Sequence, residues 1–200
     1  GISIMNNYTS SSMFFHNDKI VCKMEEYGDE EVLIMMDWEH PAMSASAAYV
    51  TQGGGDILEI GFGMGISAGY IQSHSISSHT IIENHPQIIE KLKTWANGKS
   101  NVNIISQSWA DVTGSLGRYD GIFYDTHMDY RSNLLSSSLS SLTKNGSKLT
   151  YWNSNDPLND SSQMNLSNVN YKTISVSPTV SSSQYFPSGS TTYYMPMREF

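Results

Sequence analysis

Short apolar runs alternate with amphipathic segments through the middle of the chain. The apolar runs predict buried strands at 56–60, 80–83, 102–105, 119–124 and 147–152. Helical patterns fill the gaps: one begins near Ile66, one begins at Pro86, and one runs from Leu134 to a stop at 145–146. Strands that alternate with helices indicate an α/β fold with a mostly parallel sheet and helices on both faces.

The C-terminal part of the chain carries a different pattern. Residues 171–176 and 191–195 are both strand-like, and no helical pattern separates them. Consecutive strands of this kind predict an antiparallel hairpin, since a parallel connection needs a crossover. The polar segment 153–168 is expected to form a loop or a short irregular helix.

The N-terminal part precedes this alternation. Segments 20–24 and 31–36 predict two short strands, and 1–18 predicts a mobile arm in which Tyr8, Phe14 and Phe15 offer an aromatic lid. A helix is expected from Pro41 to about Tyr49, because proline is favoured in a first helical turn. We therefore divide the chain into an N-terminal arm and short hairpin, 1–31, and an α/β domain, 32–200.

Charge and composition limit the kinds of partner that the protein is expected to bind. The 200 residues carry a net charge of −8 and only three arginines, so we expect no nucleic-acid partner. An acidic protein suits a small cationic ligand better. Cys22 is the only cysteine, and the sequence contains neither a signal-peptide pattern nor a transmembrane run. We expect a cytoplasmic protein without membrane attachment, and no Cys/His spacing predicts a bound metal.

A glycine-rich turn follows the first strand of the α/β pattern. The glycines are Gly61, Gly63 and Gly65, and Ile66 stands where the third glycine of a dinucleotide fingerprint would fall. That spacing argues against a nicotinamide oxidoreductase, which remains an alternative. With Glu59 two residues earlier, the turn resembles motif I of the class I S-adenosylmethionine-dependent methyltransferases.

Acidic residues follow two further predicted strands. Glu83 lies 24 residues after Glu59, about where a ribose-binding carboxylate is expected. Asp125 follows the fourth strand, and carboxyl ends of parallel strands form the ligand-binding edge of such sheets. Ser108 and Trp109 follow the third strand, where Trp109 either flanks an adenine ring or belongs to the core.

A second motif precedes the first of these strands. From Met35 to Met43 the chain reads Met-x-x-Trp-Glu-x-Pro-x-Met. This block resembles the signature of guanidinoacetate N-methyltransferase and of the related fungal arginine N-methyltransferases. The similarity continues at 58–64, 81–84, 119–126, 149–151 and 193–196, and covers roughly 32–200. The resemblance implies a class I methyltransferase fold with a Rossmann-like sheet.

The resemblance also implies residue roles. Glu39 and Asp125 would be catalytic, holding the guanidino group of the substrate while Asp125 takes a proton. S-adenosyl-L-methionine would be the cofactor. The cofactor-binding residues would be Met35, Met43, Glu59, Gly61, Phe62, Gly63, Met64, Gly65, Ile66, Glu83, Asn84, Ser108, Trp109 and Asp125. Two carboxylates suit a planar guanidinium, although Glu39 alone would also suit a helix start and Asp125 a loop.

Our leading hypothesis is an N-methyltransferase for a small guanidino or amino compound resembling guanidinoacetate. Methylation of protein arginine side chains is the alternative within the class. A non-catalytic module that binds an adenosine ligand is the alternative from another class, and a homodimer is left open. The chain departs from the family at Thr126-His127 and after Tyr151, which are the segments expected to contact the substrate beyond its guanidino group.

Overall fold

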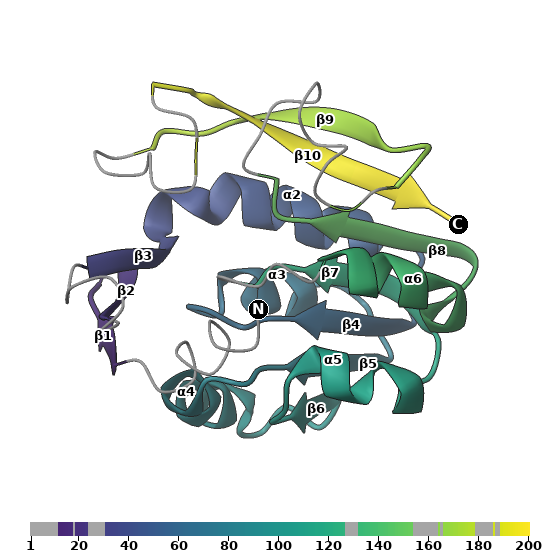
Figure 1. The fold of residues 1–200 in the computed structure, drawn as a ribbon, viewed down its shortest axis with the longest axis horizontal. Coiled ribbons are helices and arrows are strands. Elements are labelled where there is room, and N and C mark those ends of the chain that lie inside the picture. Colours follow the sequence, from purple (N-terminus) through teal and green to yellow (C-terminus); the bar gives the residue numbers. More distant parts are fainter. Residues whose placement is uncertain are drawn as a thin grey trace.

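A seven-stranded sheet forms the centre of the molecule (Figure 1). The computed structural model describes residues 12–17, 19–23, 31–126, 132–153, 164, 166–178, 186 and 189–200. Along the sheet the strand order is β6-β5-β4-β7-β8-β10-β9. The strands are β4 (Asp56–Ile60), β5 (Ser78–Ile82), β6 (Val102–Ile105), β7 (Tyr119–Tyr124), β8 (Thr143–Tyr151), β9 (Asn170–Ser175) and β10 (Thr192–Glu199).

Strand directions confirm the predicted plan. Strands β6, β5, β4, β7 and β8 pair in parallel, with β4 at the centre. Strand β10 pairs antiparallel with both β8 and β9. The fold is therefore an α/β sheet of the Rossmann-like type that a C-terminal antiparallel hairpin closes.

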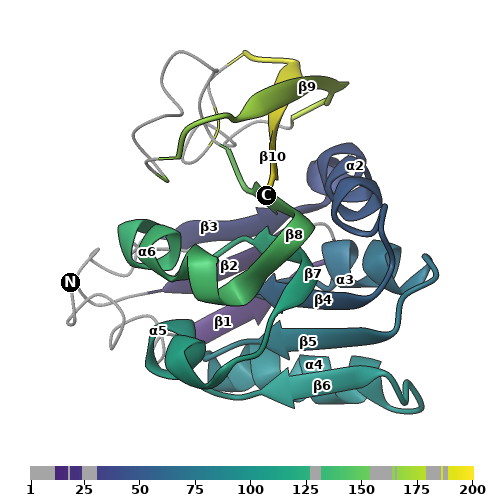
Figure 2. The same ribbon diagram turned by 90° about the vertical axis from the view of Figure 1, so that its right-hand side faces the viewer.

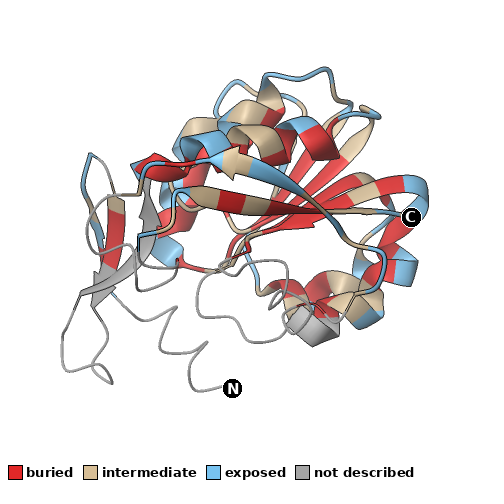
Figure 3. Ribbon diagram, turned by 90° about the horizontal axis from the view of Figure 1, so that it is seen from above, coloured by how far each residue is buried: buried red, intermediate tan, exposed pale blue. Residues whose placement is uncertain are grey.

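Helices cover both faces of the sheet (Figure 2). They are α2 (His40–Val50), α3 (Ile66–Gln72), α4 (Pro86–Ala96), α5 (Trp109–Val112) and α6 (Ser132–Leu142), with 3-10 turns at η2 (Asp37–Glu39) and η3 (Thr113–Ser115). Alternate strand residues face opposite layers: Ile57 and Phe123 pack with α2 and α3, whereas Leu58 and Ile122 pack with α5 and α6. Buried residues, red in Figure 3, line the central strands.

A second, three-stranded antiparallel sheet lies near the N-terminus. It comprises β1 (Ser12–Phe15), β2 (Lys19–Lys23) and β3 (Glu31–Met36). The prediction of a mobile arm over 1–18 is wrong for Ser12–Phe15. Met13 is buried, and its backbone N–H donates to Gln87 Oε1 on α4 at 2.7 Å. Pairing with β2 and docking on α4 thus order a segment whose composition alone suggested a tail.

One predicted boundary also shifts. The helix expected to stop at 145–146 ends at Leu142, and β8 begins at once. The Thr143 hydroxyl donates to the Leu139 carbonyl at 2.7 Å, and the Gly146 N–H donates to the Phe200 carbonyl at 2.6 Å. The last residue of the chain therefore extends the pairing of β8 where a turn was expected.

Candidate active site

The glycine turn ties three strand ends together. The Gly61 N–H donates to the Ile82 carbonyl at 2.8 Å, and the Asp125 N–H donates to the Ile60 carbonyl at 2.9 Å. Gly61 has φ +96°, and a Cβ there would lie 1.9 Å from the carbonyl oxygen of Asp125. Glycine is therefore required at 61, because any side chain would separate β4 from β7 at the edge of the sheet.

Glu83 lies just beyond β5 and is anchored to this turn. Its Oε1 accepts from the Phe62 N–H, and its Oε2 accepts from the N–H groups of Asn84 and His85, each at 3.0 Å. The side chain is 5% exposed. Burial raises the pKa of Glu83, and these amide hydrogen bonds oppose that rise. The structure thus holds a buried carboxylate against the glycine turn, in the place predicted for ribose recognition.

Asp125 lies on the other side of β4. Glu59 on β4 is in register with Ile81 on β5 and Phe123 on β7. Glu83 and Asp125 each come two residues later, so alternation places all three carboxylates on one face of the sheet. Burial, and then the charges of Glu59 and Glu83, raise the pKa of Asp125 to about 7. Asp125 is therefore poised to exchange a proton near neutral pH.

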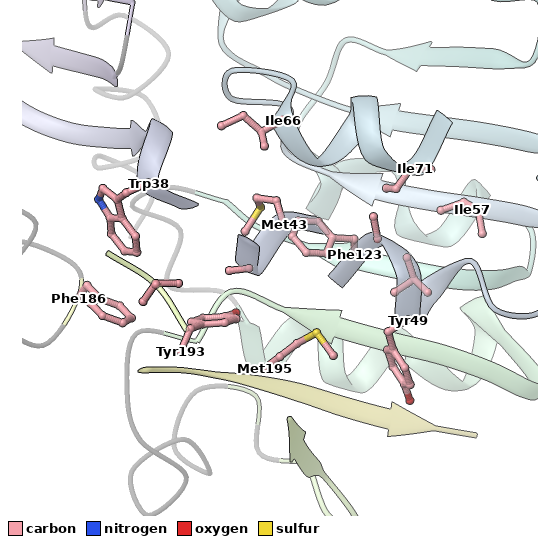
Figure 4. Close-up of a cluster of buried hydrophobic side chains, with 14 of the residues drawn as sticks. Trp38, Met43, Tyr49, Ile57, Ile66, Ile71, Phe123, Phe186, Tyr193 and Met195 are labelled. Atoms are coloured by element: carbon pink, nitrogen blue, oxygen red, sulfur yellow. The ribbon is translucent and has the colours of Figure 1, made fainter. Parts of the chain in front are cut away.

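Helix α2 brings Glu39 to the same end of the sheet. At the C-terminus of α2, the Val50 carbonyl oxygen packs closely on Gly121, near the start of β7. A Cβ atom at Gly121 would lie only 2.0 Å from that oxygen. Met43, one turn into the helix, packs with Phe123 near the end of β7 (Figure 4). The helix therefore runs antiparallel to β7, and its first turn approaches the strand end that carries Asp125. Glu39 is 3% exposed there.

Aromatic side chains surround the start of α2. Trp38 packs against Phe186 with ring centroids 5.0 Å apart and against Trp152 at 6.2 Å, and Trp152 stacks on Tyr193 at 4.8 Å. Sequence reasoning gave none of Trp38, Phe186 and Tyr193 a role at the site, because they come from three distant segments. Their packing fixes the 3-10 turn that presents Glu39.

The remaining predicted cofactor residues fall into two groups. Phe62, Gly63, Met64, Gly65 and Asn84 lie in or beside the glycine turn, whereas Met43, Ile66 and Trp109 are buried in core clusters. Trp109 packs edge-on against Tyr124 at 5.7 Å. Ser108 precedes α5 and is partly exposed. The side chain of Met35 lies outside the described residues, as do His127 and Tyr8.

Glu59 is not at the surface of this edge. It is 0% exposed, its Oε1 lies 2.8 Å from His79 Nε2, and its Oε2 accepts from the Ser67 hydroxyl. From the sequence, His79 is expected beside a serine-rich turn and not as a metal ligand, because the predicted strand begins one residue after it. In the structure β5 begins at Ser78, so 79, 81 and 83 share one face of a strand, and that alternation was the available signal.

A groove of about 700 Å³ borders the glycine turn and lies between the N-terminal sheet and α4. Its lining includes Phe15, Ile20, Phe62, Gly63 and Trp95.

Within the described part of the chain, no group of three or more His, Cys, Asp or Glu side chains has the arrangement of a metal site. Among the helices that the structure describes, none is long and apolar enough to cross a membrane.

The site fits an adenosine-bearing ligand on two observations. The glycine turn has positive φ at Gly61, Gly63 and Gly65, which lets the backbone approach a ligand closely. The Phe62–Glu83 hydrogen bond shows that this backbone and a buried acid at the end of the next strand are adjacent. Fold and site together define the class I methyltransferase architecture.

Solved structures of other proteins share this fold. A spermidine synthase solved in complex with the transition-state analogue AdoDATO superposes with a TM-score of 0.65 at 12% identity, covering 94% of this chain and 68% of the other. Fibrillarin from Aeropyrum pernix, solved with natively bound S-adenosyl-L-methionine, superposes with a TM-score of 0.57 at 12% identity, covering 93% and 97%. At these identities the likeness establishes the fold alone.

Sequence comparison supplies the family. The guanidinoacetate N-methyltransferase model matches residues 18–174, and the chain belongs to that family of N-methyltransferases. Protein arginine N-methyltransferase 2 of Kluyveromyces lactis is 34% identical over 139 residues, which is 64% of this chain and 33% of that protein. The chain thus spans about a third of the length of this relative.

Proposed function

We propose that this chain is an S-adenosylmethionine-dependent methyltransferase that acts on a guanidino nitrogen. The observation that carries the proposal is that two acids, the buried Glu39 and the partly buried Asp125, come to one end of the sheet beside a nucleoside-type glycine turn. A lone adenosine-binding module would need the turn and Glu83 but neither of these acids.

The cofactor would be held by the glycine turn and Glu83. When bound, S-adenosylmethionine supplies a methyl group on a cationic sulfonium. The acids Glu59, Glu83 and Asp125 give this edge a negative field that favours such a cation. The chain as a whole is acidic as well, with 11 Lys and Arg against 19 Asp and Glu.

Glu39 and Asp125 would bind and activate the acceptor. A guanidinium is planar and protonated at neutral pH, so it is a poor nucleophile until a proton leaves. Two carboxylates can fix its plane through charge-assisted hydrogen bonds. As the nitrogen lone pair forms its bond to the methyl carbon, the bond from that carbon to sulfur would break and S-adenosylhomocysteine would leave. The nitrogen would then lose a proton, which Asp125 would accept. A base with a pKa near the working pH suits that task.

The acceptor carrying the guanidino group has two candidates. The family description points to guanidinoacetate, whereas the matched relatives are named for protein arginine. The relatives' names favour an arginine side chain in a protein. The small guanidino compound expected from the sequence is the alternative.

An acceptor panel tests the proposal. The protein is incubated with S-adenosylmethionine labelled in its methyl group and with guanidinoacetate, free arginine, an arginine-containing peptide, or the same peptide with lysine in place of arginine. We expect label in at least one guanidino acceptor and none in the lysine peptide. Label in the lysine peptide alone would contradict the guanidino assignment. Calorimetry showing no binding of S-adenosylhomocysteine would contradict the class of reaction.

A further inference from the structure

A chain of four side chains lies beneath the candidate site. Gln72 Nε2 on α3 lies 3.0 Å from His79 Nδ1, and His79 Nε2 lies 2.8 Å from Glu59 Oε1. The Ser67 hydroxyl donates to the other oxygen of Glu59. His79 and Glu59 are both 0% exposed, and the edge of the His79 ring packs on Trp95 of α4.

The donors and acceptors of this chain define its charge. An amide nitrogen can only donate, so Gln72 assigns Nδ1 of His79 as an acceptor and leaves the ring proton on Nε2. That proton is donated to Glu59, which accepts from Ser67 as well. The arrangement is complete with a neutral imidazole and an ionised carboxylate. A buried carboxylate without such donors would become protonated.

The charge of Glu59 reaches the reactive end of the sheet. Among the described residues, the acids whose charges act on Asp125 are Glu59 from β4 and Glu83 at the end of β5. Glu83 is held by backbone amides of its own edge. Glu59 is held by side chains from other elements, Ser67 on α3 and His79 on β5. Its charge therefore depends on residues that substitution can change.

We propose that His79 is a positioning residue that keeps Glu59 ionised beneath the site, and that this fixed charge adds to the basicity of Asp125. The inference rests on the proposed function, because it assigns Asp125 the role of base. The competing interpretation is that His79 and Glu59 only complete the hydrogen bonding of the core. In that case, removing the donor would change stability and leave the titration of Asp125 unaltered.

Carbon-13 NMR of the unliganded protein distinguishes the two. Aspartate carboxyl carbons are labelled, the Asp125 signal is assigned by its loss in Asp125→Asn, and its titration is followed in each variant. In His79→Leu we expect the Asp125 midpoint to fall by about one pH unit, because a neighbouring negative charge is lost. His79→Gln retains an amide donor and should bring the midpoint back toward wild type. The matched control is His74→Gln, at an exposed histidine between α3 and β5, which should not shift the Asp125 midpoint.

Glu59→Gln decides the matter if His79→Leu does not fold. It removes the charge itself while keeping the shape, so the Asp125 midpoint should fall by a similar amount. A midpoint that is unchanged or higher in folded Glu59→Gln would overturn the proposal, as would an unchanged midpoint in folded His79→Leu. The titration uses no cofactor and no acceptor. A protein that fails to methylate guanidino compounds would therefore overturn only the proposed function.

Discussion

The two sides of the central strand β4 use the same chemical group in different ways. Burial raises the pKa of both Glu83, on the β5 side, and Asp125, on the β7 side. At Glu83, hydrogen bonds from backbone amides to the carboxylate oppose the rise. At Asp125, the charges of Glu59 and Glu83 add to the rise. These different environments fit the roles proposed for the two carboxylates, with Glu83 as a binding group and Asp125 as a base.

The comparison is tested most strongly at Asp125. Asp125→Asn keeps the size of the side chain and its capacity to hydrogen-bond, but it cannot accept a proton. We expect turnover to fall by about 10²–10⁴, the usual contribution of a general base. Single-turnover transfer of a labelled methyl group measures the effect, and binding of S-adenosylhomocysteine should persist. Asp111→Asn on the exposed face of α5 serves as the control. Transfer within a few-fold of wild type would leave Asp125 only a substrate-orienting role.

Glu39 tests whether the β7 side recognises a cation. Glu39→Gln removes one of the two charges that would face a guanidinium, and acceptor affinity should fall by about 2–5 kcal/mol. Cofactor affinity should change little, because Glu39 comes from the turn before α2 and the glycine turn is untouched. Titration of the acceptor in the presence of S-adenosylhomocysteine measures both. Asp37→Asn, two residues earlier on the surface, is the matched control. Wild-type acceptor affinity in Glu39→Gln would reduce Glu39 to a helix-start residue.

Glu83 tests the opposite side. Glu83→Ala should weaken S-adenosylhomocysteine binding by about 1.5–3 kcal/mol, the scale of a hydrogen bond to a charged group. Isothermal titration gives the value, with Glu90→Ala on the exposed face of α4 as the control. Unchanged affinity in a folded Glu83→Ala variant would move the ribose contact to another residue. Tight binding of NAD in its place would contradict the class of cofactor.

The smallest expected effect is on stability. A carboxyl group whose pKa is raised by folding favours the native state at low pH, and this contribution is lost as pH rises through the folded-state pKa, about 7 for Asp125. Asp125→Asn should therefore stabilise the unliganded protein at pH 8, by about 1–2 kcal/mol because Asp125 is partly exposed, and by little below pH 4. Urea unfolding at several pH values measures the gain. A gain that is largest at low pH would show that the sign of the shift is wrong.

The sequence predicts local features of this site better than distant ones. Glycine spacing, Glu83 and the closing hairpin follow from short segments, and the structure bears out the parallel sheet and the hairpin. Strand β1 was missed, because its order comes from Met13 docking on Gln87 of α4, 74 residues away. The role of His79 was missed because the predicted strand starts at Thr80, just after it. In the structure β5 starts at Ser78, so His79 lies within the strand and on the same face as Glu83. The raised pKa of Asp125 arises first from burial and then from acids on two other strands, and no local pattern contains either cause.

Because the end of α2 contacts Gly121, the length of that helix determines how far its first turn reaches along β7. Its eleven residues span about 16 Å, and the extended chain from Gly121 in β7 to Asp125 just beyond it spans about 13 Å. Because the Val50 end is held against the strand, adding or deleting one residue within α2 would turn Glu39 by about 100° about the helix axis. The helix must therefore keep its number of residues for Glu39, the residue just before it, to approach the end of β7.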